Sequence, residues 1–201
     1  MRKLYLRDRS AEVVAAWRQP FSDLAATGRV DISRGDIFDG PSADAIVSPA
    51  NSFGYMDGGI DRAYLDRFGM SLQDRLQGVI RDDFFGELHV GQAVLVSTGD
   101  VPIAWLVSAP TMRVPMNVAR TTNAYVAMRA ALVAVAEHNS QVPKQRIDDL
   151  LCPGLCTAIG GMNPRVAAKQ MRAAWDTVFA GKRWVRPDDA RSSQQELLEP
   201  N

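Results

Sequence analysis

Short apolar runs alternate with amphipathic stretches along most of this chain. Runs of aliphatic and β-branched residues are typical of strands, and they occupy residues 3–7, 30–37, 43–48, 92–97, 104–108 and 147–151. Apolar residues at helical spacing predict helices over residues 11–24, 61–68, 72–84, 121–138 and 164–179. Strands and helices that alternate in this way indicate an α/β fold with a mixed, mostly parallel sheet and helices on both faces.

Several positions refine this pattern. Pro20 interrupts the first helical stretch, because proline breaks a helix interior. The runs at 92–97 and 104–108 are continuous apolar and β-branched segments, which predicts central strands covered on both faces. We expect Asn163 to cap the last helix, with Pro164 at its first position.

The end of the chain differs from the rest. Residues 187–201 are polar and show no clear period, which predicts an unpacked tail, although Leu197 and Leu198 could dock elsewhere on the protein. The sequence contains no internal repeat. We therefore expect a single domain over residues 1–186, large enough for a full core, followed by a polar C-terminal tail over 187–201.

Charge and composition narrow the function classes. The chain has 201 residues with 23 basic and 23 acidic side chains, and its zero net charge argues against a broad electrostatic grip on nucleic acid. Its apolar runs are too short to span a bilayer. Charged residues at 7–9 break the first run, which argues against a signal peptide. The default expectation is a cytoplasmic protein without a membrane partner.

Metal and thiol chemistry have little support. The chain contains two cysteines, Cys152 and Cys156, and two histidines. A structural zinc site needs a full ligand set at recognisable spacing, so we expect no metal and no cofactor. The cysteines are interpreted as reduced thiols, one at a strand end and one in a loop. A nucleophilic Cys156 would need a cationic neighbour, which the sequence does not display.

Three polar or glycine-rich motifs follow predicted strands. They are residues 35–37, the loop from Asn51 to Asp61 with its pair Gly58-Gly59, and residues 153–162. In open α/β sheets, ligands collect at the carboxyl ends of the strands. A loop that enters a helix presents free N–H groups and suits an anion such as a diphosphate. Two such loops could hold one extended phosphorylated ligand between them.

Common nucleotide and hydrolase motifs are absent. A Walker A loop needs lysine and a hydroxyl residue after its last glycine, whereas Gly160 is followed by Gly161 and Met162. The dinucleotide-binding fingerprint with three spaced glycines is missing, and so is the serine nucleophile elbow. ATP hydrolysis with magnesium and classical hydride transfer are therefore not expected.

The motifs resemble the signature of the macrodomain family. Gly35-Asp36-Ile37, then the segment 43–51 ending in Asn51, then Gly58-Gly59-Ile60-Asp61 are similar to that family's Gly-Asp-Ile, Asp-Ala-Ile-Val-Asn-Ala-Ala-Asn and Gly-Gly-Val-Asp motifs. The loop at 153–162 looks like the family's second phosphate loop and is most similar to its bacterial and phage branch. The resemblance covers residues 30–180 and implies a three-layer α/β/α sandwich with an ADP-ribose pocket.

The resemblance also implies residue roles. Asp36 would accept from the adenine amino group and the Ile37 backbone would contact the same ring. Asn51 would hold the distal ribose, and the two glycine loops would hold the diphosphate. The full set of expected ligand-binding residues is Asp36, Ile37, Asn51, Gly58, Gly59, Ile60, Asp61, Thr157, Ala158, Ile159, Gly160, Gly161 and Met162. A branched side chain at Gly160 is expected to fill the phosphate space.

Structural roles compete with these assignments. Asp36 could cap a turn, Asn51 could form the turn after residues 49–50, and Asp61 could be the N-cap of its helix. Each of these residue types serves local structure as readily as it binds a ligand. The sequence leaves both interpretations open.

Two activities follow from the resemblance. The first is hydrolysis, in which Asp61 activates or orients a water and Asn51 fixes the ribose, either removing ADP-ribose from a target or removing phosphate from ADP-ribose 1''-phosphate. The second is a reader that binds ADP-ribose or a modified partner without turnover. Ser48 and Pro49 replace the first two residues of Asn-Ala-Ala-Asn, which favours the reader. Nucleic acid enters only as a modified substrate.

Overall fold

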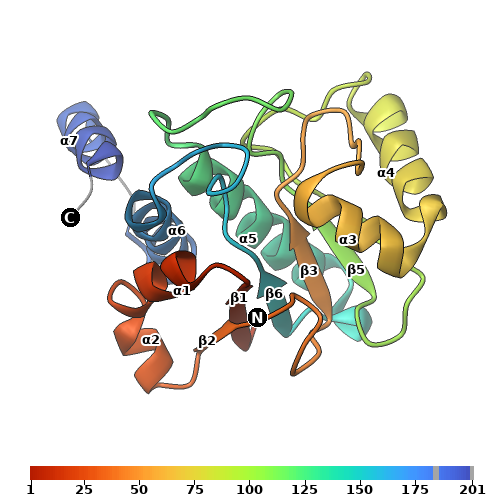
Figure 1. Cartoon of the computed structure of the whole chain (residues 1–201), viewed down its shortest axis with the longest axis horizontal. Helices are drawn as coiled ribbons and strands as arrows, with labels where there is room; N and C mark the ends of the chain where they lie inside the picture. Colours follow the sequence, from red (N-terminus) through yellow and green to blue (C-terminus); the bar gives the residue numbers. More distant parts are fainter. Residues whose placement is uncertain (183–185, 200–201) are drawn as a thin grey trace.

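The computed structural model describes residues 1–182 and 186–199, and six strands form its single sheet (Figure 1). The strand order is β2-β1-β6-β3-β5-β4. Every pairing is parallel except that of β4 with β5. The strands are β1 (Lys3–Asp8), β2 (Val30–Arg34), β3 (Ala45–Ser48), β4 (Val94–Ser97), β5 (Trp105–Ser108) and β6 (Asp149–Cys152).

Helices cover both faces of this sheet. They are α1 (Ala11–Arg18), α2 (Ser22–Ala26), α3 (Gly59–Phe68), α4 (Met70–Asp83), α5 (Asn123–Gln141), α6 (Pro164–Phe179) and α7 (Pro187–Leu198), with a short 3-10 turn η1 (Pro143–Gln145). Helices α1, α5 and α6 share one apolar cluster with the sheet, while α3 and α4 share the other. None of these described helices is long and apolar enough to cross a membrane.

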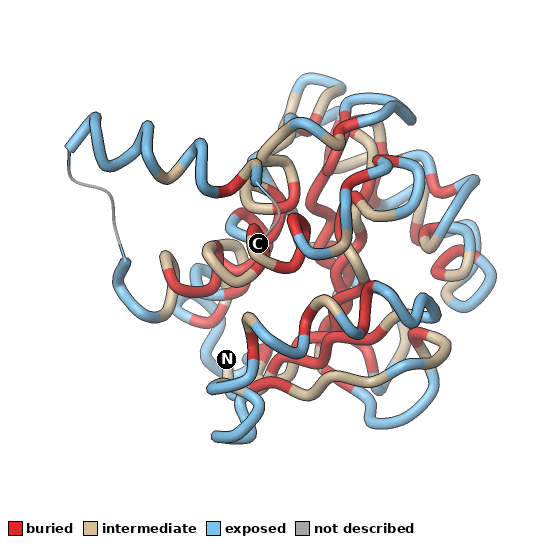
Figure 2. Tube along the Cα trace, turned by 60° about the vertical axis from the view of Figure 1, so that its left-hand side comes forward, coloured by how far each residue is buried: buried red, intermediate tan, exposed pale blue. Residues whose placement is uncertain are grey.

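Strand alternation builds the two cores. In β3, Ala45 and Val47 belong to the cluster with α1, α5 and α6, whereas Ile46 between them belongs to the cluster with α3 and α4. Successive side chains of a strand point to opposite faces, so a wholly apolar strand must be covered on both sides. Figure 2 shows the resulting buried centre. The expected three-layer α/β/α fold with a mixed, mostly parallel sheet is confirmed.

Two predictions about individual elements are wrong, one on the position of a strand in the sheet and one on the start of a helix. The run at 92–97 forms β4, which is an antiparallel edge strand rather than a central one. Whether a strand is central or at the edge depends on which other strands pair with it, and the local sequence pattern does not contain that information. Helix α3 begins at Gly59 rather than at Asp61. The first N–H groups of a helix have no partner within it, and glycine is tolerated at these positions.

The start of α6 follows the prediction and the tail does not. The side-chain oxygen of Asn163 accepts from the N–H of Arg165 at 2.9 Å, and Pro164 is the first helical residue. Residues 187–198, predicted to be unpacked, form α7. Leu197 is buried, and its carbonyl accepts from Nε2 of Gln170 on α6 at 3.0 Å. The dipeptide that could dock therefore anchors the end of the helix, while most of α7 stays exposed.

Candidate functional site

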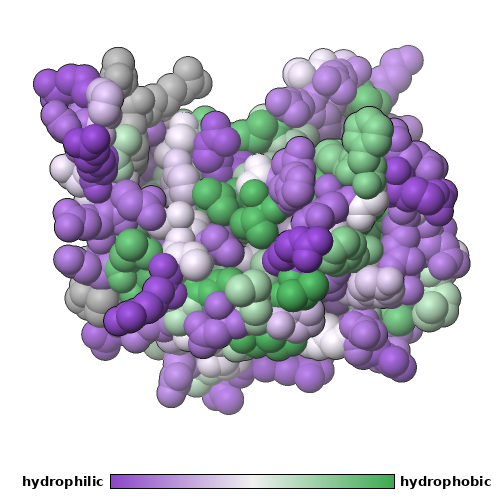
Figure 3. Space-filling view, turned by 90° about the horizontal axis from the view of Figure 1, so that it is seen from above, coloured by the Kyte–Doolittle hydropathy of each residue, from purple (hydrophilic) through white to green (hydrophobic). Residues whose placement is uncertain are grey.

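A cleft of about 510 Å³ opens at the carboxyl ends of the strands. Loops after β1, β2, β3, β5 and β6 line it. Figure 3 views the molecule from this side and shows hydrophobic residues gathered near the middle of the face, with hydrophilic ones around them. Gly59 and Gly160, far apart in the sequence, both line this one cleft. The two glycine loops therefore converge, as the strand-end argument requires.

The side chain of Asn51 is occupied by its own loop. Its Oδ1 accepts from the N–H groups of Phe53 at 3.1 Å and Tyr55 at 3.3 Å, and its Nδ2 donates to the Tyr55 carbonyl at 2.7 Å. This is the turn-forming role that competed with ligand binding. An amide has two N–H donors, so one remains for a ligand at the cleft that Asn51 lines.

The glycine pair sets the start of α3. Gly58 is the N-cap with φ −147°, no side chain caps the helix, and Gly59 is its first residue with φ +58°. The first N–H groups of a helix have no partner within it, and here they border the cleft. Asp61 lies in the first turn rather than at the N-cap, so the capping interpretation of Asp61 is wrong.

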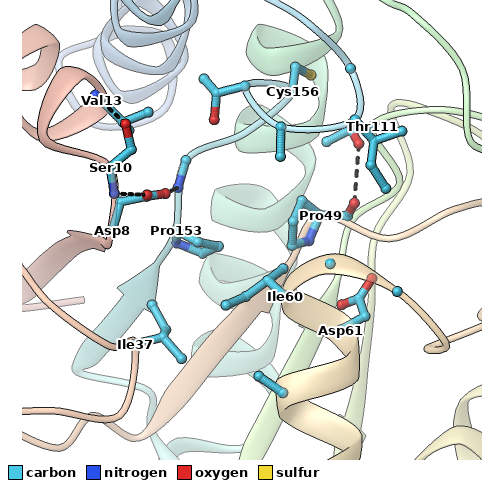
Figure 4. A pocket seen from close by; sticks show the side chains of 18 of the residues that line it. Asp8, Ser10, Val13, Ile37, Pro49, Ile60, Asp61, Thr111, Pro153 and Cys156 are labelled. Atoms are coloured by element: carbon cyan, nitrogen blue, oxygen red, sulfur yellow. Dashed lines mark hydrogen bonds between the residues drawn. The ribbon is translucent and has the colours of Figure 1, made fainter.

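Asp61 is a buried carboxyl group at the edge of the cleft (Figure 4). Ser48 at the end of β3 donates its hydroxyl to Oδ1 of Asp61 at 2.5 Å. Burial raises the pKa of Asp61 to about 7, the negative charge of Asp57 adds to the rise, and the Ser48 hydrogen bond opposes it. A carboxyl group that titrates near neutral pH can take up and release a proton under ordinary conditions.

The β6–α6 loop is closed by its own hydrogen bonds. The N–H of Gly161 donates to the Ala158 carbonyl at 3.0 Å, and that of Met162 donates to the Cys156 carbonyl at 2.9 Å. The N–H of Val118 donates to the Gly160 carbonyl at 2.8 Å, which ties the loop to the segment before α5. These bonds shape the loop and consume N–H groups that the sequence analysis assigned to phosphates.

Most of the predicted ligand-binding residues line the cleft, and two do not. Met162 is 1% exposed and packs in the core cluster with α5 and α6, so its side chain serves packing. Gly161 is exposed with φ +64°, and a Cβ there would lie 2.8 Å from Nδ2 of Asn117, but Gly161 does not line the cleft. The residues that line the cleft are Asp36, Ile37, Asn51, Gly58, Gly59, Ile60, Asp61, Thr157, Ala158, Ile159 and Gly160.

Asp36 has both of its carboxylate oxygens engaged. Oδ1 accepts from the N–H of Phe38 at 3.0 Å, and Oδ2 pairs with the guanidinium of Arg9. The Phe38 hydrogen bond is the main cause that lowers the pKa of Asp36; burial opposes it and Arg9 adds to the lowering. The turn-capping role therefore exists, and an adenine amino group would share this ionised carboxylate with Arg9.

A carboxylate at the end of β1 also faces the cleft, although none of the three sequence motifs contains it. Asp8 lines the cleft, where its Oδ1 accepts from the N–H of Ser10 at 2.8 Å and its Oδ2 accepts from the N–H of Gly154 at 3.1 Å (Figure 4). It thereby braces the β6–α6 loop against β1. The signal for Asp8 in the sequence is its place in the charged run at 7–9, directly after an apolar run, because the strand-end rule applies to β1 as well.

Comparisons with known proteins decide the family. The Macro domain family matches residues 47–171. An Aeropyrum pernix protein, itself named only as uncharacterized, is 31% identical over 157 residues, which are 77% of this chain and 74% of that protein. The chain belongs to the macrodomain family.

Solved macrodomains share the fold of this macrodomain at lower identity. An Oceanobacillus iheyensis macrodomain variant with ADPR is 20% identical, with a TM-score of 0.56 over 82% of this chain and 88% of that one. Thermosipho africanus DarTG in complex with ADP-ribose is 17% identical, with a TM-score of 0.54, and this chain covers 45% of that one. At such identities the likeness shows the fold.

Neither cysteine of this macrodomain has the surroundings of a nucleophile. Burial raises the pKa of the Cys156 thiol to about 12 and raises that of Cys152 further. Both are free and buried, and a thiol that stays protonated is a poor nucleophile. Within residues 1–182 and 186–199, no three His, Cys, Asp or Glu side chains gather closely enough to hold a metal ion.

Gly160→Ala is expected to destabilise the macrodomain instead of merely blocking phosphate. A Cβ at Gly160 would lie 2.5 Å from the Cys156 carbonyl oxygen and 2.8 Å from Cγ2 of Val118. The Cβ points into the loop and not into the cleft, so the expectation that a side chain at Gly160 fills the phosphate space is wrong. Backbone displacement should cost about 1–3 kcal/mol of unfolding free energy, measurable by urea denaturation.

The control for this prediction is Gly58→Ser. A Cβ at Gly58 meets nothing within 4 Å, its backbone is extended, and serine is a preferred N-cap. That variant should keep or raise the unfolding free energy. A Gly160→Ala protein as stable as the wild type would contradict the contact geometry of the β6–α6 loop.

Proposed function

We propose that this macrodomain binds ADP-ribose in the cleft and hydrolyses the bond that joins its distal ribose to a modified target. One observation carries the proposal. Two glycine loops, at 58–60 and 157–160, face a single cleft, and Asp36 and the buried Asp61 line the same cleft. Backbone N–H groups suit a diphosphate, and the carboxyl groups suit a base and a ribose.

The printed ligands of related structures support this choice. The Oceanobacillus iheyensis macrodomain carries ADPR and the Thermosipho africanus protein carries ADP-ribose, both on the fold found here. A molecule of this kind is elongated, with a purine at one end, two phosphates in the middle and a ribose at the other end. We assign the purine to Asp36 and Ile37, the phosphates to the glycine loops, and the distal ribose to the neighbourhood of Asn51 and Asp61.

Asp61 supplies the chemistry in this proposal. In the hydrolysis step the bond between the anomeric carbon and the target breaks, which builds positive charge on that carbon, and a water oxygen bonds to the carbon in its place. The water gives up a proton and the departing target group takes one up. Oδ1 of Asp61 accepts from Ser48, while Oδ2 has no hydrogen-bond partner among the described residues. We assign the water to Oδ2. A base with a pKa of about 7 accepts a proton and releases it again at neutral pH. Hydrolysis of ADP-ribose 1''-phosphate is a variant of the same arrangement.

A reader without turnover is the second candidate. Asn51 spends three hydrogen bonds on its own loop, which leaves less of its amide to fix a ribose. In addition, Ser48 and Pro49 replace two residues of the family motif. Binding tolerates such changes more readily than catalysis, because a reacting group must be positioned closely.

Two measurements on the same preparation separate these functions. Calorimetric titration with ADP-ribose should show saturable heat for either candidate. Incubation with an ADP-ribosylated carrier should release free ADP-ribose only if the macrodomain is a hydrolase, and ADP-ribose 1''-phosphate should release inorganic phosphate only if it is a phosphatase. Heat of binding with no release in either assay identifies a reader. The absence of heat would contradict the assignment of ADP-ribose as the ligand.

Asp36→Ala is expected to weaken ADP-ribose binding more than tenfold. The substitution removes an ionised acceptor from the cleft, and a charge-assisted hydrogen bond contributes more than about 1.4 kcal/mol. The measurement is the Kd for ADP-ribose by calorimetry, in a variant whose circular dichroism matches the wild type.

Asp39→Ala is the matched control for this prediction. Its carboxylate accepts from the N–H of Asp36 at 3.3 Å in the same turn, so it removes the same charge, but Asp39 does not line the cleft. We expect its Kd to stay within about threefold of the wild type. Equal losses in both variants would mean that the turn, and not the adenine contact, is what Asp36 contributes.

A further inference from the structure

Ser48 and Asp61 form a buried pair that the family resemblance did not anticipate. Ser48 ends β3 and is fully buried, and its hydroxyl donates to Oδ1 of Asp61 at 2.5 Å. Asp61 faces the cleft and Ser48 does not line it. Ser48 therefore contacts the carboxyl group from behind, on the side away from a ligand.

The geometry points to Ser48 as the residue that positions Asp61, holding Oδ1 so that Oδ2 faces the cleft as the reacting oxygen. This inference rests on the proposed function of Asp61. A carboxylate side chain can rotate about its terminal bonds, and a fixed donor on one oxygen selects one orientation. Because the donor also favours the charged form of its acceptor, Ser48 keeps part of the Asp61 population ionised at neutral pH.

The other groups around Asp61 do not supply this effect. Asp57, in the loop before α3, carries a like charge and raises the pKa of Asp61. Tyr64, one turn later on α3, donates its hydroxyl to the Val47 carbonyl at 2.9 Å, and burial raises its own pKa well above the usual value, with Asp61 adding to the rise. Among the described residues, no basic side chain forms an ion pair with Asp61. Ser48 is thus the one hydrogen-bond donor that stabilises its charge in this part of the chain.

The neighbouring strand offers a matched control. Ser108 ends β5, pairs in register with Ser48, and is also fully buried. Its hydroxyl has no hydrogen-bond partner in the part of the chain that the structure describes. Ser108→Ala therefore removes a buried hydroxyl from the same level of the sheet without touching Asp61, so it reports the cost of the substitution alone.

The test measures the midpoint at which Asp61 titrates. Unfolding free energies of the wild type, Ser48→Ala and Ser108→Ala are measured between pH 5 and 9, each with and without Asp61→Asn. The pH at which the Asp61-dependent part stops falling is the midpoint of the Asp61 titration in the folded chain, and it should lie about one pH unit higher in Ser48→Ala than in the wild type or Ser108→Ala. The pH profile of ADP-ribose release should move in the same direction, with the loss largest in kcat.

An unchanged midpoint in Ser48→Ala would overturn the inference. If that variant does not fold, Ser48→Cys replaces it, because a thiol leaves no cavity, although it is larger than the hydroxyl, and it is a weak donor. Its midpoint should also rise, and no rise again refutes Ser48. Absence of hydrolysis in the wild type would refute the proposed function instead. The unfolding measurements do not need a substrate, so the two failures remain distinguishable.

Discussion

Asp61→Asn is expected to lower the rate of ADP-ribose release about 10²–10⁴-fold, the usual contribution of a general base. Asparagine has the same shape, and its amide oxygen can still accept from Ser48, so the loop should keep its geometry. It cannot take a proton from water. Binding of ADP-ribose should be unchanged or tighter, because a negative charge beside the diphosphate is removed. Single-turnover release and calorimetry measure the two effects separately.

Asp57→Asn is the control for this loss of rate. Asp57 also lines the cleft and lies in the same loop, but it is exposed, so it lacks the buried surroundings that raise the pKa of Asp61. Its replacement should change the rate less than about tenfold. A reversed order, with Asp57 the more damaging position, would move the catalytic assignment from Asp61 to Asp57.

The same carboxyl group should make the protein less stable as the pH rises from about 4 to about 7. Its pKa is about 7 in the folded chain, against an ordinary value of 3.8 for an aspartate in water, so within this window the folded state holds a proton that the unfolded state has lost. Stability then falls by about 1.4 kcal/mol per pH unit. The total is about 4 kcal/mol, fully lost above pH 7 and absent in Asp61→Asn.

The measurement is the difference in unfolding free energy between wild type and Asp61→Asn across pH 4.5–8.5. Taking the difference cancels the contributions of carboxylates whose pKa is lowered on folding. One is Asp23, whose pKa Arg172 lowers to about 2, and its contribution to stability is lost only as the pH falls below about 4. Asp66→Asn removes an exposed acid from the same helix, where it pairs with Arg62, and it controls for the loss of one negative charge from α3. A flat difference for Asp61→Asn would mean that Asp61 is not buried as a carboxyl group.

These two results bear on hydrolase and reader in different ways. Loss of stability with pH requires only that Asp61 is buried and ionises with difficulty. Loss of rate requires that a water and an anomeric carbon meet Oδ2. A macrodomain with the first property and without the second would hold ADP-ribose as a reader, and Asn51, already committed to its loop, would explain why.

Local chemistry made much of the fold predictable. Apolar runs identified the strands, since a strand buried on two faces consists almost entirely of apolar residues. Asn163 with Pro164 marked the start of α6, because capping is a contact between near neighbours. The edge position of β4 and the docking of α7 through Leu197 were not predictable in the same way. Both depend on what arrives from distant parts of the chain.

The candidate site divides along the same line. Motif order alone indicated that residues 35–37, 51–61 and 153–162 meet at one edge of the sheet, because parallel strands bring their carboxyl ends together. All but Gly161 and Met162 of the expected ligand-binding residues line the cleft. Motif order did not indicate that Met162 faces the core, that Asp8 braces the β6–α6 loop, or that a Cβ on Gly160 points inward. Those facts depend on side-chain direction within irregular loops, for which no period exists.

The sequence by itself determined the layered α/β architecture, which follows from periodicity, and the three segments that surround the cleft, which follow predicted strands. It indicated the family only through motifs that resemble that family's signature. Tertiary structure alone decided that Ser48 meets Asp61 across 13 positions of chain and that burial brings the pKa of that carboxyl to about 7. The proton affinity of an acid depends on the solvent and charges around it, and only the folded chain removes the water.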